Sequence, residues 1–138
     1  MSDNKNVKIF VSVIVILILG TIATVLIQSK NSVPAGPGKY DDFATCLKDK
    51  GLVFYGAFWC PHCQAQKKLF GSSAKFLPYV ECSTPDASGQ TQACIDKKIQ
   101  SYPTWELPDG TIIPDDSTNG AGVTLQTLAA KSGCVLPQ

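Results

Sequence analysis

Two cysteines three positions apart, Cys60 and Cys63, are the residues of this sequence best suited to chemistry. They follow a continuous apolar run and begin a segment of helical pattern, with Pro61 at the first helical position, where a helix tolerates proline best. In the first turn of a helix, two cysteines at this spacing lie within disulfide reach, and the unpaired backbone N–H groups favour a thiolate at the first of them. We therefore predict thiol–disulfide exchange, in which Cys60 attacks and Cys63 resolves the mixed disulfide.

His62 is the single histidine of the chain and lies between these cysteines. A positive charge at His62 would further stabilise the Cys60 thiolate, while a surface histidine without a role is the alternative. A zinc site would need a second close pair of ligands, and Cys82 and Cys94 are far apart in sequence. A purely structural bond within the first pair is also an alternative, although so short a loop adds little stability. We expect no metal and no cofactor.

The elements that must position the pair follow two hydrophobic periodicities. The predicted helices cover residues 41–51, 61–71, 91–100 and 124–133, and the predicted strands cover residues 52–58, 76–80, 104–107 and 111–113. Asp41 or Asp42 is expected to cap the first of these helices and Thr124 the last, and Gly71 is expected to end the helix that begins at Pro61. The last two strands flank a Pro-Asp-Gly turn and predict a hairpin.

Residues 9–29 carry no charge and are mostly Val, Ile and Leu, which is long enough to span the hydrocarbon core of a membrane. A buried core helix is one alternative, but a segment apolar on all sides leaves a small domain no polar face to expose. A cleaved signal peptide is the stronger alternative, because residues 33–35 loosely resemble a cleavage site. We predict an uncleaved anchor over residues 9–29, a Pro/Gly-rich linker over residues 30–39 and one folded domain over residues 40–138.

Lysines flank the apolar segment equally, so the charge count does not orient it. All six cysteines follow the segment, and an even set of cysteines is typical of an oxidising compartment. We therefore expect residues 1–8 to be a short cytoplasmic tail and the catalytic domain to lie outside the cytoplasm on a single-pass anchor in the cell membrane. The 12 basic residues, all lysine, are balanced by 11 acidic residues, so nucleic-acid binding is not expected.

The sequence motifs also carry a resemblance. Phe-Trp-Cys-Pro-His-Cys at residues 58–63, followed by Ser-Tyr-Pro-Thr at residues 101–104, resembles the thioredoxin superfamily over residues 40–135. Together with Tyr-Val-Glu-Cys-Ser at residues 79–83 and with Trp105, it more closely resembles the thioredoxin-like domain fused to, or partnering, bacterial and plant vitamin K epoxide reductase homologues. The resemblance implies a thioredoxin-like α/β fold, with a central mixed sheet flanked by helices, preceded here by one transmembrane helix.

The resemblance also implies roles for individual residues. The catalytic roles fall on Cys60, Cys63 and His62, and the substrate-binding roles on Pro61, Tyr102 and Pro103. Pro103 would be a cis-proline that faces the disulfide, and the backbone of Tyr102 would pair with an extended substrate peptide. An ordinary trans proline at a strand start is the alternative. Many thioredoxins have a buried acidic residue where this chain has Phe54, so proton transfer at Cys63 must use water or another group.

Four cysteines remain for structural disulfides. Cys82 and Cys94 flank a polar loop, and the closer resemblance includes such a pair. Cys46 and Cys134 are then left over, and a bond between them would close a long loop. Six cysteines allow fifteen full pairings, so the connectivity stays open at this point.

These observations predict a membrane-anchored thiol–disulfide oxidoreductase outside the cytoplasm. The resemblance implies that it oxidises protein dithiols and passes the electrons to a vitamin K epoxide reductase-like membrane quinone reductase. A disulfide reductase or isomerase is the nearer alternative, because the redox potential depends on how each state is stabilised. A non-enzymatic copper-binding carrier is the farther alternative, because two exposed thiolates suit Cu(I).

Overall fold

The computed structural model describes residues 3–30 and 37–138, and the chain divides into two compact units, Met1–Ala35 and Gly36–Gln138. In the first unit, helix α1 (Asp3–Lys30) is 28 residues long. Within the part of the chain that the structure describes, no helix combines the length and the apolarity needed to cross a membrane. The anchor predicted over residues 9–29 is therefore not confirmed, and residues 31–36 of the predicted linker lie outside the described residues.

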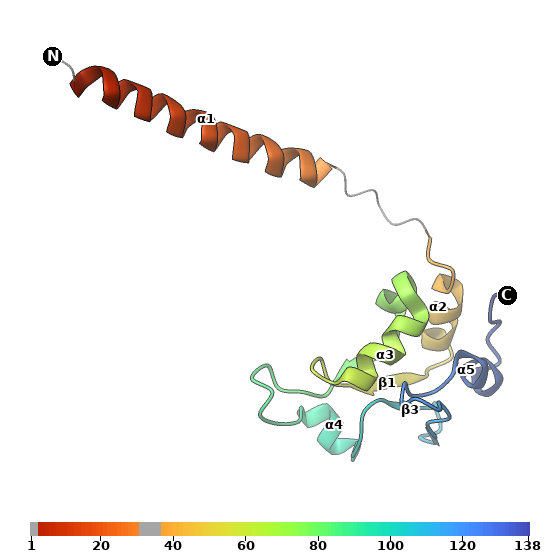
Figure 1. Cartoon of the computed structure of the whole chain (residues 1–138). Coiled ribbons are helices and arrows are strands. Elements are labelled where there is room, and N and C mark those ends of the chain that lie inside the picture. Colours follow the sequence, from red (N-terminus) through yellow and green to blue (C-terminus); the bar gives the residue numbers. More distant parts are fainter. Residues whose placement is uncertain (1–2, 31–36) are drawn as a thin grey trace. The chain divides into compact units, whose positions relative to one another are not determined.

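The second unit is built on a four-stranded mixed sheet in the order β2-β1-β3-β4 (Figure 1). Its strands are β1 (Val53–Gly56), β2 (Tyr79–Glu81), β3 (Thr104–Glu106) and β4 (Ile112–Ile113). Its helices are α2 (Asp41–Asp49), α3 (Pro61–Phe70), the 3-10 helix η1 (Gly71–Phe76), α4 (Gln92–Asp96) and α5 (Leu125–Ser132). Strand β1 is parallel to β2 and antiparallel to β3, and β3 is antiparallel to β4. The sheet flanked by helices fits the predicted thioredoxin-like fold, and the predicted order of elements is confirmed.

Strand β1 divides the interior into two clusters because its successive side chains point to opposite faces of the sheet. Phe54 belongs to the larger cluster, where its ring stacks on Trp105 at 4.9 Å between centroids. Tyr55 belongs to the smaller cluster, with Ile99 and the cysteines of the Cys82–Cys94 disulfide. Helix α3 lies on one side of β1 and helix α4 on the other (Figure 1). The continuous apolar run of β1 is thus explained by burial on both faces.

The predicted starts of α2 and β2 are both wrong. Asp41 does not cap α2: Tyr40 is the N-cap residue and makes no side-chain cap bond, while Asp41 Oδ2 accepts from the N–H of Gly38 at 2.8 Å. Strand β2 begins at Tyr79 rather than at Phe76, because residues 71–76 form the 3-10 helix η1. The apolar run that predicted this strand therefore mixes a helical turn with the strand itself.

Helix α4 is also shorter than predicted and ends at Asp96. Lys98 has a φ of 55°, a left-handed conformation that cannot continue a right-handed helix. Ile95 on the helix is half exposed, while Ile99, which lies within the predicted helix but beyond its observed end, is buried. The predicted cap of α5 is confirmed, since Thr124 Oγ1 accepts from the N–H of Thr127. Gly71 ends α3, as predicted.

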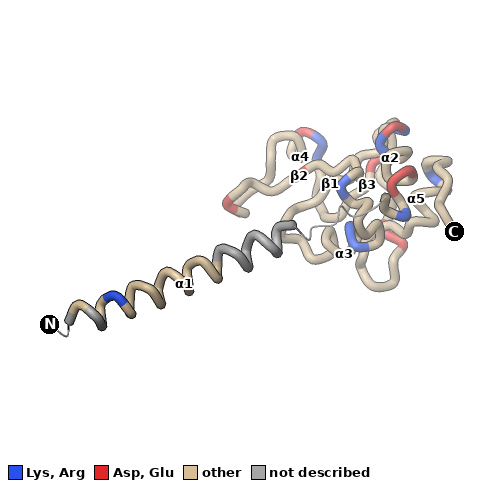
Figure 2. Tube along the Cα trace, turned by 90° about the horizontal axis from the view of Figure 1, so that it is seen from above, with Lys and Arg blue, Asp and Glu red and all other residues tan. Residues whose placement is uncertain are grey.

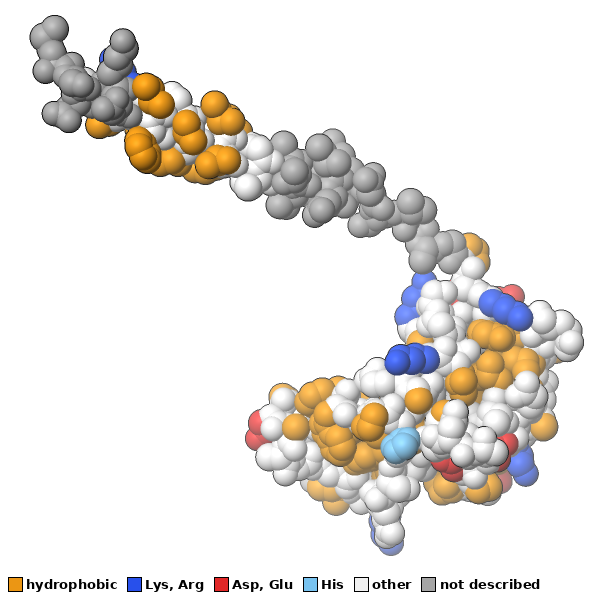
Figure 3. Space-filling view, in the orientation of Figure 1, with side chains coloured by type: hydrophobic (Ala, Val, Ile, Leu, Met, Phe, Trp, Pro, Cys, Tyr) orange, Lys and Arg blue, Asp and Glu red, His pale blue; other side chains and the backbone are white. Residues whose placement is uncertain are grey.

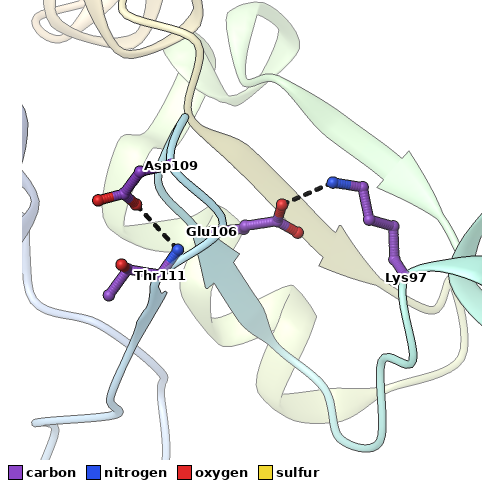
Figure 4. Close-up of polar contacts among 4 residues, drawn as sticks. All are labelled: Lys97, Glu106, Asp109 and Thr111. Atoms are coloured by element: carbon purple, nitrogen blue, oxygen red, sulfur yellow. Dashed lines mark hydrogen bonds and ion pairs between the residues drawn. The ribbon is translucent and has the colours of Figure 1, made fainter.

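The predicted hairpin is formed by β3 and β4, and its turn is stabilised by Asp109, whose Oδ1 accepts from the N–H of Thr111 at 2.9 Å (Figure 4). On β3, the buried carboxylate of Glu106 pairs with Lys97 Nζ at 2.7 Å, and this raises the pKa of the lysine (Figure 4). Burial, and then the hydrogen bond with Glu106, raise the pKa of Tyr55.

Elsewhere in the described part of the second unit, basic and acidic residues are interspersed along the chain, so neither sign of charge gathers in one region (Figure 2).

Two disulfides cross-link the second unit. Cys46 of α2 is bonded to Cys134, which follows α5, with 6.0 Å between the Cα atoms. Cys82, directly after β2, is bonded to Cys94 of α4, with 5.5 Å between the Cα atoms. These are the two pairs that the sequence analysis considered.

Candidate active site

The predicted exchange pair lies at the N-terminus of α3, and both cysteines are free and buried. Cys60 is the N-cap residue, and its Sγ accepts from the N–H of Cys63 at 3.4 Å. Pro61 occupies the first helical position, as predicted. The hydrogen bond and the positive end of the helix dipole both stabilise negative charge on Cys60 Sγ. The arrangement suits Cys60 as the attacking thiol.

Cys63 has different surroundings, because its side chain is completely buried. Burial raises the pKa of Cys63 to about 12, so this thiol is protonated at neutral pH. Its Sγ packs over Gly56 of β1, where an added β carbon would lie only 2.9 Å from the sulfur. The same β carbon would lie 2.8 Å from Cε2 of Tyr79, so glycine is required for Cys63 and Tyr79 to fit side by side.

The loop before Cys60 is fixed by a carboxylate that the sequence analysis did not single out. Oε1 of Glu81 accepts from the N–H groups of Phe58, at 3.2 Å, and of Ser83, at 2.8 Å. Trp59 is held in turn, since its Nε1 donates to Ser83 Oγ at 2.8 Å. Phe58 and Trp59 nevertheless keep about half of their surface exposed, at 48% and 53%. The end of β2 therefore positions two exposed aromatic side chains next to the thiol pair.

Tyr102 and Pro103 also lie beside Cys60, and the peptide bond between them is cis, as the resemblance implies. The Cys60 thiol donates to the carbonyl oxygen of Tyr102 at 3.8 Å. The Tyr102 ring packs edge-on against Trp59, and its hydroxyl accepts from Gln90 Nε2 at 2.6 Å. The structure thus brings the predicted substrate-binding residues to the attacking thiol, while their contact with a substrate stays a prediction.

His62 is exposed and lines a cleft of about 210 Å³ together with Ser101, Tyr102, Pro103, Asp115 and Gly120. Gly120 has a φ of 68°, and a β carbon there would lie 3.0 Å from the His62 ring. In the space-filling view, this single histidine borders an area of hydrophobic side chains (Figure 3). The structure therefore places His62 at the edge of the site, and its predicted catalytic role stays a prediction.

Gln66 is a second residue that the sequence analysis missed. Its side chain is completely buried, donates to the carbonyl oxygen of Val123 at 2.9 Å and accepts from the N–H of the same residue at 2.7 Å. Because residues 115–122 lead directly into Val123, this amide fastens one wall of the cleft to helix α3. The sequence offered one indication of this role: Gln66 lies three positions after Cys63, on the helix face that carries the buried side chains.

Among the described residues, no group of three or more His, Cys, Asp or Glu side chains is arranged to hold a metal ion. The chemistry open to Cys60 and Cys63 by themselves is the formation and cleavage of a disulfide, which needs no cofactor. The fold and the paired thiols define a class of protein, the thioredoxin-like thiol–disulfide oxidoreductases.

Comparison with known proteins agrees with this class. No protein-family model matches the chain. The chain is 41% identical over 96 residues to the thiol-disulfide oxidoreductase LTO1 of Arabidopsis thaliana. The match covers 67% of this chain and 24% of the plant protein, so the chain spans about a quarter of that relative's length. Together with the fold, this similarity supports an oxidoreductase enzyme of the thioredoxin-like type.

Proposed function

We propose that this chain is a membrane-anchored, extracytoplasmic enzyme that oxidises protein dithiols and passes the electrons to a vitamin K epoxide reductase-like membrane partner. The observation that carries the exchange chemistry is the pair of free cysteines at the N-terminus of α3. The Sγ of Cys60 accepts a hydrogen bond from the N–H of Cys63. The relative's name, thiol-disulfide oxidoreductase, supports the same chemistry. The membrane partner follows from the sequence resemblance.

The reaction starts from the disulfide form of Cys60 and Cys63. A substrate thiolate attacks Cys60 Sγ and forms a mixed disulfide, while Cys63 leaves as a thiolate and takes up a proton. The second substrate thiol then loses its proton and attacks the substrate sulfur of the mixed disulfide, which releases Cys60 as a thiolate that takes up a proton. The substrate leaves as a disulfide, and the enzyme holds two electrons and two protons as a dithiol. The same exchange with a disulfide of the membrane partner returns the enzyme to its oxidised form.

The surroundings of Cys60 support a peptide substrate. Phe58 and Trp59 offer exposed aromatic surface next to the thiol pair, and the Tyr102 carbonyl oxygen lies 3.8 Å from Cys60 Sγ. An extended peptide that carries the substrate cysteine gains apolar contact from the aromatic rings and hydrogen bonds from the backbone.

The proposed location rests on two features. Residues 9–29 carry no charge, and the described apolar side chains of α1 are exposed, with Phe10 at 73%. Exposed apolar surface of this extent favours an apolar environment. The disulfides Cys46–Cys134 and Cys82–Cys94 support an oxidising compartment for the domain.

A trapping experiment tests this proposal. The Cys63→Ala variant of the full chain has no second thiol to expel a partner from Cys60, so it should accumulate a reducible adduct with an integral membrane protein. Cys60→Ala is the matched control and should form no such adduct. The adduct is detected on non-reducing gels of membranes and identified by mass spectrometry. If the trap captures soluble proteins alone while the oxidised enzyme is being regenerated, the membrane partner is wrong and a reductase or isomerase becomes the better assignment.

A further inference from the structure

The resolving step sets a chemical requirement at Cys63. This residue attacks the mixed disulfide only as a thiolate, yet its thiol is completely buried, and burial raises its pKa to about 12. On β1 its neighbourhood is apolar, with Phe54 in the core and Gly56 under the sulfur. A nearby positive charge would favour the thiolate and make the proton easier to lose.

Lys67 supplies such a charge. It lies four residues after Cys63 on α3, and residues at this spacing share a helix face. Its Nζ lies 3.4 Å from the centroid of the Tyr79 ring, which is close for a cation–π contact. The edge of the same ring reaches the space above Gly56 that Cys63 Sγ also occupies. The tyrosine ring therefore contacts the ammonium group and lies next to the resolving sulfur.

The position of Tyr79 is itself fixed. Its hydroxyl donates to Glu81 Oε2 at 2.8 Å, and its ring packs edge-on against Phe54 at 5.2 Å between centroids. Burial and the hydrogen bond to Glu81 raise the pKa of Tyr79, so it stays neutral and keeps donating across the working pH range. Since Glu81 Oε1 also accepts from the N–H of Phe58, the contact that places Lys67 is tied to the loop before Cys60.

The titratable groups near Cys63 are Cys60, the N-cap residue of α3, Lys67 on the same helix and Tyr79 on β2. Gly56 of β1 and the backbone of Ala57, directly after β1, complete its surroundings, and Glu81 acts on Tyr79 through their hydrogen bond. A thiolate at Cys60 opposes ionisation of Cys63, and the Lys67 cation lowers the pKa of Cys63.

We infer that Lys67 is a positioning residue for the resolving step: its ammonium group, held over Tyr79, favours the Cys63 thiolate. This inference rests on the proposed exchange function. Cys63 gives its proton to water, and the thiolate attacks Cys60 Sγ and forms the internal disulfide. The bond between Cys60 and the partner breaks, and the partner leaves as a thiolate that takes up a proton. The step is an exchange and needs no further oxidant.

The test follows the two thiols of the full chain separately, in detergent, with an aromatic disulfide (DTNB) that releases one coloured thiolate at each attack. Cys60 releases the first, and Cys63 releases the second when it resolves the adduct. In Lys67→Gln the second phase should be about threefold slower at pH 7, and its pH profile should move up by about half a unit, since half a pKa unit is a threefold change in thiolate population. Lys67→Arg should restore the rate.

Lys68→Gln is the matched control, because it removes an exposed charge from the same helix turn without touching Tyr79. It should leave both phases unchanged. Tyr79→Leu should slow the second phase as Lys67→Gln does, because it removes the ring that holds the ammonium group. If the second phase of Lys67→Gln matches the unchanged chain at every pH, the inference is wrong while the exchange function stands. If the unchanged chain releases no second thiolate, the proposed function itself fails.

Discussion

The four cross-linked cysteines and the two free ones lie in contrasting parts of the fold. Cys46–Cys134 joins α2 to the segment after α5, and Cys82–Cys94 joins the segment directly after β2 to α4. The free pair lies at a helix N-terminus, where a backbone N–H and a backbone carbonyl contact the attacking sulfur. The frame of the domain is thus held by covalent bonds, and the exchange site by hydrogen bonds and ring contacts.

This difference shows how a protein that forms and breaks disulfides can keep structural disulfides of its own apart from that exchange. The Cys82–Cys94 bond is completely buried, so an exchanging thiol does not reach it, while Cys60 keeps a small exposed surface, as do Cys46 and Cys134 of the other bond. The walls of the site depend on side-chain amides and a carboxylate, those of Gln66, Gln90 and Glu81.

The largest expected effect on stability comes from removing the structural disulfides Cys46–Cys134 and Cys82–Cys94. The double variant Cys46→Ala with Cys134→Ala should lower the free energy of unfolding by about 4–5 kcal/mol, and Cys82→Ala with Cys94→Ala by about 3 kcal/mol, because the longer loop restricts the unfolded chain more. Urea unfolding under non-reducing conditions measures both. Both variants should still release two coloured thiolates from the aromatic disulfide. Loss of that release would show that the frame and the exchange site are not separate.

A smaller effect on stability is expected from replacing Gln66, whose side-chain amide binds the backbone of Val123 at the end of the cleft wall. Gln66→Met keeps the volume of the side chain but leaves the N–H and the carbonyl of Val123 without their partners, which should lower the free energy of unfolding by about 2 kcal/mol. Gln126→Met on the exposed face of α5 is the control and should change it by less than about 0.5 kcal/mol. Equal effects in the two variants would contradict the role of Gln66.

The smallest expected effect is the pH dependence that Cys63 adds to the reduced protein. Its pKa is raised in the fold to about 12, so the unfolded chain loses this proton first, and the stabilisation present below about pH 9 is lost as the pH rises toward 12. Between pH 8 and 10.5 the reduced protein should lose about 1–2 kcal/mol more than Cys63→Ala does. Denaturant midpoints measured under argon give the difference. A zero difference would mean that Cys63 is not desolvated.

The sequence predicted the elements well where a local signal was present. The apolar run of β1, the proline that begins α3, the hairpin turn and the threonine cap of α5 are each determined by residues close in the chain. The exchange pair was also predicted, because its chemistry depends on spacing within one helical turn. The boundaries at β2 and α4 were wrong because a 3-10 turn and a left-handed Lys98 interrupt patterns that look continuous.

The rest of the site depends on contacts between distant residues. Gln66 meets Val123 and Glu81 meets Phe58 across more than twenty positions of sequence, and no local pattern marks these partners. Lys67 looks like an ordinary surface lysine until the fold places the Tyr79 ring beneath it. Sequence periodicity predicts which face of a helix or strand is buried, but it does not predict which polar groups meet there.

The Cys46–Cys134 bond has a mechanical consequence. Its cysteines are 88 positions apart, and only the segments before residue 46 and after residue 134 lie outside the loop that it closes. A force applied between residue 40 and the C-terminus is therefore carried by the bond, and the sheet between β1 and β4 bears no load. Under tension the oxidised domain should extend only by its two short ends, whereas reduction of this one bond exposes the domain to the pull, apart from the loop that Cys82–Cys94 closes.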